Sequence, residues 1–197
     1  MAWSKVFTTS NSVTLGASWA VNKNAGGAAS SVTSVKTDDS TSGMCAAMTC
    51  KWIQETLRNG DLTSAGQLGS MQNIAIAHRV YRRDLAQTEA GDDIDNLMAT
   101  FGLKGTKRSA GTLQNKLRFL FETLAIPGMV YCSFSRPGGG HALGFKIATT
   151  GNYFFDPNQG LFKFGTQNDL LQVMEANMTT TYLQRYTDYS LRHVVAG

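Results

Sequence analysis

The hydrophobic pattern of this chain changes part-way along its length. Between about residues 44 and 124, apolar side chains recur near the 3.6-residue period of amphipathic helices. From about residue 129 to residue 164, short aromatic and aliphatic runs are separated by Gly, Pro and Asn, which predicts antiparallel strands joined by turns. A series of helices followed by a series of strands indicates an α+β domain. We therefore expect a helical half packed on an antiparallel β-sheet.

The same patterns give approximate bounds for each element. Helices are expected at about residues 44–57, 64–89, 92–101, 112–124 and 168–177. Strands are expected at about residues 129–134, 141–147, 153–155 and 161–164, with a closing strand around 181–194. Residues 1–40 are rich in Ser, Thr, Val, Ala and Gly, and are expected to be partly irregular, with short strands at residues 13–15 and 32–35.

Composition narrows the function classes. With 197 residues, 42% hydrophobic and 16% charged, the chain is long enough and apolar enough to bury a core. The net charge of +4 comes from scattered Lys and Arg residues, so we expect no nucleic-acid site. No run approaches the ~20 apolar residues of a membrane span, and the N-terminus lacks the apolar core of a cleaved signal peptide. The three cysteines have no CxxC spacing and no nucleotide-binding loop appears, so we expect no metal, disulfide or cofactor.

One cysteine has a local setting that suits a nucleophile. Cys45 falls in the first turn of the helix expected from about residue 44, where unpaired N–H groups and the helix dipole stabilise a thiolate. Burial as a small apolar side chain is the commoner fate of a cysteine, and Cys50 and Cys132 are expected to be core thiols. Trp52, two helical turns after Cys45, is expected to pack beneath the site.

A histidine and an aspartate lie in strand-and-turn settings further along. His141 follows a glycine run and opens an apolar strand, a position that suits the edge of a cleft, although a plain hairpin loop would also use those glycines. Asp156 opens the segment Asp-Pro-Asn-Gln-Gly, whose residues favour a turn. Its alternative role is therefore that of a turn-initiating aspartate. It follows His141 by 15 residues, enough for one strand, a turn and a return strand. We therefore expect a hairpin to bring Asp156 beside His141, with Asn158 as the second choice of partner.

These three settings together resemble the YopT/AvrPphB family. The motifs are Gly-x-Cys-x-Ala at a helix start, Gly-Gly-His-Ala-x-Gly in a strand and Phe-Phe-Asp-Pro-Asn-x-Gly in a turn, and the resemblance covers roughly residues 42–164. These are papain-like cysteine proteases that bacteria deliver into host cells. The resemblance implies a papain-like hydrolase domain at residues 41–197, with Cys45 as nucleophile, His141 as general base and Asp156 as the acid that orients the histidine.

The sequence departs from the family upstream of the cysteine. The family has an Asn there that completes the oxyanion hole, whereas residues 37–42 read Thr-Asp-Asp-Ser-Thr-Ser. The backbone N–H of Cys45 remains as one expected donor, with Ser40, Thr41 or nearby main chain as the second. Because losing an oxyanion donor costs ~10²–10³ in rate, two alternatives to proteolysis stay open. One is a glutamine deamidase or transamidase that uses the same triad, and the other is a non-catalytic interaction module.

The resemblance also implies where the protein works. We expect a secreted effector or toxin that leaves its cell without a cleavable signal peptide and acts on a protein substrate in the cytosol of a host or target cell. A monomer is expected. A protein that inhibits the enzyme, or gives the producing cell immunity to it, is a further expected partner.

Overall fold

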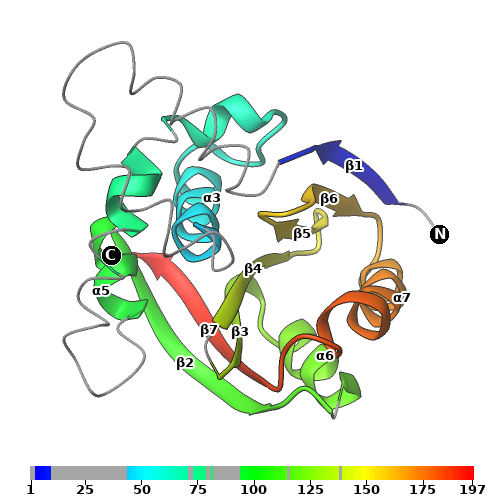
Figure 1. Cartoon of the computed structure of the whole chain (residues 1–197). Helices are drawn as coiled ribbons and strands as arrows, with labels where there is room; N and C mark the ends of the chain where they lie inside the picture. The colour runs from blue at the N-terminus through cyan, green and yellow to red at the C-terminus, as the bar shows by residue number, and fades with distance from the viewer. Residues whose placement is uncertain are drawn as a thin grey trace, which may run out of the picture.

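The computed structural model describes residues 3–9, 44–70, 73–78, 81, 94–114, 116–137 and 139–197. Within them, seven strands form one antiparallel sheet in the order β1-β6-β5-β4-β3-β7-β2 (Figure 1). The strands are β1 (Trp3–Phe7), β2 (Leu103–Thr112), β3 (Gly128–Arg136), β4 (Gly139–Ile147), β5 (Asn152–Asp156), β6 (Gly160–Phe164) and β7 (Asp188–Ala196). The helices are α3 (Cys45–Asn59), the 3-10 helix η2 (Ala65–Leu68), α5 (Ile94–Thr100), α6 (Lys116–Leu124), α7 (Gln167–Asn177) and the π-helix η3 (Met178–Tyr182).

Both faces of the sheet are covered by helices. Helices α3 and α5 contribute to one apolar cluster, and α6 and α7 contribute to a second cluster on the opposite face (Figure 1). Successive side chains of β3 alternate between the two, with Met129 and Tyr131 in the first cluster and Val130 and Cys132 in the second. This alternation is what the two-residue period of a strand requires of a sheet that is buried on both sides. The predicted α+β class, with helices packed on an antiparallel sheet, is confirmed.

Helix α3 lies directly against the middle of the sheet. It contacts β4, β3, β5 and β7. Trp52 on its buried face is 1% exposed and stacks on Phe155 of β5, with the ring centroids 5.3 Å apart. The expected packing role of Trp52 is therefore confirmed. Helix α3 ends at Asn59, with Gly60 as its C-cap, close to the predicted bound, and Met44 at its N-cap makes no side-chain capping bond.

Several predicted bounds were wrong. The helix expected over residues 64–89 is interrupted, because the 3-10 helix η2 ends at Gly69 with a positive φ of 76°. The helix expected from residue 112 begins only at Lys116, since β2 occupies residues 103–112. Strand β2 was missed because it is a polar edge strand with alternately exposed positions, and it lacks the apolar signal of a buried strand. The closing strand begins at Asp188, because residues 178–182 form a π-helix.

The N-terminal strand was also missed by the sequence analysis. Strand β1 pairs with β6 and forms one edge of the sheet. The strands expected at residues 13–15 and 32–35 lie outside the described residues. Among the described residues, no helix is long and apolar enough to span a membrane.

Gly160 allows β1 to pass close to β6. Its φ is +121°, and a Cβ at this position would lie 2.0 Å from the backbone oxygen of Phe7 and 2.9 Å from Cα of Thr8. The next residue, Thr9, donates a hydrogen bond from its hydroxyl to the backbone oxygen of Asp156, 3.3 Å away. The absence of a side chain at Gly160 therefore lets the N-terminal segment reach the turn that carries Asp156.

We expect Gly160→Ala to destabilise the protein more than Gly60→Ala. Both glycines have a positive φ, so each substitution carries a backbone strain of about 1–3 kcal/mol. Only at residue 160 does the new methyl group meet backbone atoms, which adds about 1–3 kcal/mol, whereas nothing lies within 4 Å at residue 60. Urea denaturation measures the two losses. Equal losses would mean that β1 does not pack against Gly160 in solution.

Candidate active site

Cys45 is the first residue of α3. Its side chain is 5% exposed and belongs to the apolar cluster on the α3 side of the sheet. Helix N-termini carry a partial positive charge from N–H groups without intrahelical partners, and this charge favours a thiolate over a thiol. Cys45 therefore has the helix-start position that the sequence predicted. Cys50 and Cys132 are fully buried free thiols, and burial raises the pKa of both, so their expected role as core thiols is confirmed.

The β4–β5 hairpin brings His141 and Asp156 together. The paired strands run in register from Gly144 opposite Phe155 to Lys146 opposite Tyr153. Beyond the last pair, the Nε2 atom of His141 lies 3.0 Å from Oδ1 of Asp156. Both residues are buried, at 5% and 1% exposure. The hairpin predicted from the 15-residue interval therefore forms, and it places the two side chains in direct contact.

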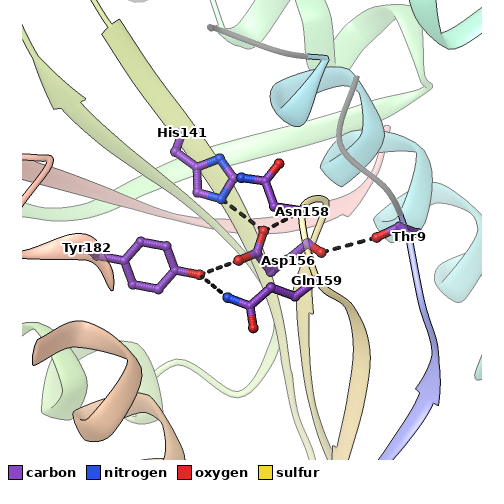
Figure 2. A network of polar contacts seen from close by, with 6 residues as sticks. All are labelled: Thr9, His141, Asp156, Asn158, Gln159 and Tyr182. Carbon is purple, nitrogen blue, oxygen red and sulfur yellow. Dashed lines mark hydrogen bonds and ion pairs between the residues drawn. The ribbon is translucent and has the colours of Figure 1, made fainter. Parts of the chain in front are cut away.

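The Asp156 carboxylate is surrounded by donors (Figure 2). Oδ1 also accepts the backbone N–H of Asn158 at 2.8 Å, and Oδ2 accepts the hydroxyl of Tyr182. Burial of Asp156 alone would raise the pKa of its carboxyl. The hydrogen bond and charge of His141, the Tyr182 hydroxyl and the Asn158 N–H outweigh burial and hold that pKa below its usual range. The buried carboxylate therefore stays charged.

His141 lies between this carboxylate and the Cys45 thiol. Because its Nε2 is bonded to Asp156, Nδ1 is the nitrogen left for the hydrogen bond with Cys45. Burial favours the neutral imidazole, but the hydrogen bonds to Asp156 and Cys45, together with their charges, outweigh it and raise the pKa of His141 to about 10. The imidazole can therefore accept a proton from the thiol and remain charged at neutral pH.

Sequence analysis missed Tyr182. Its ring stacks on His141 with the centroids 5.9 Å apart, and its hydroxyl contacts Asp156. No local motif marks it, since it follows a helix at a position where a strand was expected. The π-helical turn that carries it has no sequence signature of its own.

The oxyanion donors are only partly described. The backbone of Cys45 lies at the start of α3, as expected. Ser40, Thr41 and Ser42 lie outside the described residues.

Among the side chains that the structure describes, no group of three or more His, Cys, Asp and Glu is placed to hold a metal ion.

No family model matches this sequence, and no curated protein matches it. Among solved structures, the chain is similar to the Pseudomonas avirulence protein AvrPphB, with a TM-score of 0.59 and 18% identity over 77% of this chain and 91% of that one. The fold is papain-like. The chain also matches the ubiquitin-specific protease encoded by murine cytomegalovirus tegument protein M48, with a TM-score of 0.48 and 16% identity over 77% of this chain and 76% of that one. The likeness to AvrPphB confirms the papain-like fold that the motifs implied.

Asp156→Asn is expected to lower the pKa of His141. Burial continues to favour the neutral ring, while the substitution removes the negative charge of Asp156 and replaces the carboxylate by a neutral and weaker acceptor for the imidazolium. Nuclear magnetic resonance of ¹⁵N-labelled imidazole rings reports the titration of each of the three histidines. In the wild type, His141 should remain protonated to about pH 10.

The partly exposed His193 provides the internal comparison in the same spectra. The electrostatic account of the site would be contradicted by a wild-type His141 that titrates at its ordinary value. It would also be contradicted if the pKa of His141 were the same in the wild type and in Asp156→Asn.

Proposed function

We propose that this chain is a Cys-His-Asp thiol hydrolase and that it acts as a cysteine protease. The observation that carries the proposal is the position of His141, whose imidazole is hydrogen-bonded both to the Cys45 thiol and to the buried Asp156 carboxylate. A thiol beside a base that is itself oriented by a third group is the arrangement of an activated nucleophile. The papain-like fold supports the same conclusion.

In the proposed mechanism, His141 moves one proton in each half-reaction. Nδ1 takes the proton of the Cys45 thiol, and the thiolate sulfur attacks the carbonyl carbon of the substrate amide. The resulting imidazolium gives its proton to the departing amine as the carbon–nitrogen bond breaks, which leaves a thioester on Cys45. His141 then takes a proton from water, whose oxygen attacks the thioester, and returns it to the sulfur as the acid product leaves. Asp156 holds the ring so that Nδ1 faces the sulfur throughout.

The negative oxygen that forms in each step needs hydrogen-bond donors. We propose the backbone N–H of Cys45 as the first donor, because Cys45 is the first residue of α3, where N–H groups lack intrahelical partners and the helix dipole is positive. Ser40 remains the proposed second donor from the segment before the helix.

The biological setting is proposed from the fold and the motifs. We propose residues 41–197 as the catalytic domain of a secreted YopT/AvrPphB-type effector or toxin that acts as a monomer on a protein of the target cell. The similarity in fold to an avirulence protein of Pseudomonas supports this setting. An inhibitor or immunity protein is proposed as a partner in the producing cell.

Glutamine deamidation is the second candidate activity. It uses the same acyl-enzyme chemistry, and the two reactions differ only in which amide is presented to the thiolate. The observation in its favour is that residues 37–42 contain no Asn or Gln to act as an oxyanion donor.

Comparison of the wild type with Cys45→Ala in a target-cell lysate tests these proposals. Proteolysis predicts new protein N-termini that appear with the wild type and are absent with Cys45→Ala and His141→Ala. Deamidation predicts uncut proteins whose mass rises by about one unit per modified glutamine, with the same dependence on Cys45. N-terminal profiling and a deamidation search of the same samples measure both.

The matched control is Cys50→Ala, which removes a thiol from the same helix five residues away. We expect it to retain activity if the protein remains folded, because Cys50 is fully buried in the core. Products that do not depend on Cys45, or no products together with a Cys45 that iodoacetamide labels no faster than Cys50 or Cys132, would favour a non-catalytic interaction module.

A further inference from the structure

The chain leaves α7 through an unusual turn that ends at Tyr182. Residues 178–182 form a π-helix, and the backbone N–H of Leu183 donates to the oxygen of Met178, 2.9 Å away, five residues earlier. Turns of this kind are rare and occur frequently at functional sites. Here the turn places Tyr182, which is 2% exposed, beside the His141–Asp156 pair.

The Tyr182 hydroxyl donates a hydrogen bond to the carboxylate oxygen of Asp156 that is not bonded to His141. Oδ1 of Asp156 accepts from His141 and from the Asn158 N–H, and Oδ2 accepts from Tyr182 (Figure 2). Burial and the neighbouring Asp156 charge raise the pKa of Tyr182 well above its ordinary value. The phenol therefore keeps its proton and remains a donor over the whole working range of pH.

The Tyr182 ring also contacts the imidazole. The planes of Tyr182 and His141 are inclined by 22°. In addition, the side-chain amide of Gln159, in the turn after Asp156, donates to the Tyr182 hydroxyl at 3.5 Å. One side chain from the C-terminal part of the chain therefore contacts the base, the acid and the turn that carries the acid.

We propose that Tyr182 is a positioning residue of this site, whose hydroxyl fixes the Asp156 carboxylate and whose ring supports the plane of His141. The inference rests on the proposed function, since it assigns Tyr182 to the same Cys45–His141–Asp156 site. Tyr182 acts through Asp156 and His141 and has no direct part in bond making or breaking.

Tyr182→Phe keeps the ring and removes the hydroxyl. One oxygen of a buried carboxylate then loses its donor, so Asp156 takes up a proton at a higher pH than in the wild type. A neutral Asp156 no longer supports the imidazolium that accompanies the Cys45 thiolate. We therefore expect the acid limb of the rate of Cys45 alkylation by iodoacetamide to move to higher pH. On that limb the rate should fall about tenfold, since a hydrogen bond to a charged group is being removed.

Tyr189→Phe is the matched control. Tyr189 is also 2% exposed, and its hydroxyl also donates to a carboxylate, that of Glu122 at 2.5 Å. The substitution therefore removes a hydroxyl–carboxylate bond from the same apolar cluster, but at a partly exposed carboxylate away from His141. We expect no shift of the acid limb, and a smaller loss in unfolding free energy because Glu122 keeps the donors Ser109 and Arg118 and part of its hydration. In the Asp156→Asn background, Tyr182→Phe should change the alkylation rate little, because the acceptor charge is already absent.

Peptide mapping of the alkylated protein gives the rate at each cysteine, with Cys50 and Cys132 as internal references. If Cys45 of the wild type reacted no faster than these two cysteines, the proposed thiol hydrolase function itself would be contradicted. A fast wild-type Cys45 whose acid limb is the same in Tyr182→Phe and Tyr189→Phe would overturn only the role of Tyr182. A Tyr182→Phe protein that is unfolded at neutral pH while Tyr189→Phe is folded would also overturn it, since Tyr182 would then be a residue of the core and not of the site.

Discussion

The arrangement of this site depends on the buried carboxylate of Asp156. A charge with 1% exposure is stable only if donors replace the water it has lost, and here they come from His141 on β4, the turn after β5 and Tyr182 after α7. The contact between His141 and Asp156 contributes both to the raised pKa of His141 and to the lowered pKa of Asp156. His141 also contacts Cys45, so the charge of Asp156 acts on the imidazole that lies beside the start of α3.

This requirement explains how the two faces of the sheet are used. Asp156 follows Phe154 by two residues and so shares its face of β5, the α7 side, from which Tyr182 can reach the carboxylate. Cys45 belongs to the cluster on the opposite, α3 side. His141 at the start of β4 contacts both. Strand β1 adds a further constraint, because Thr9 bonds the backbone oxygen of Asp156 and Gly160 leaves room for that approach.

Local patterns in the sequence predicted the parts of the site that are continuous along the chain. The helix start at Cys45, the hairpin between His141 and Asp156 and the burial of Trp52 each follow from periodicity, turn residues or spacing. Tyr182 and β1 could not be found this way, because their importance comes from contacts with residues 26 and more than 140 positions away. Strand β2 was missed for another reason, since an exposed edge strand does not need apolar alternation.

This arrangement requires that Asp156 is ionised within the folded protein. Its most direct test is the ¹³C chemical shift of the Asp156 carboxyl carbon, followed as the pH of the folded wild type is lowered. The donors around the carboxylate predict that this carbon keeps the shift of an ionised group down to a pH below the usual range of aspartate. A carboxyl that takes up its proton above that range would mean that burial outweighs the donors. Asp156 would then be neutral at low and moderate pH and could not support His141.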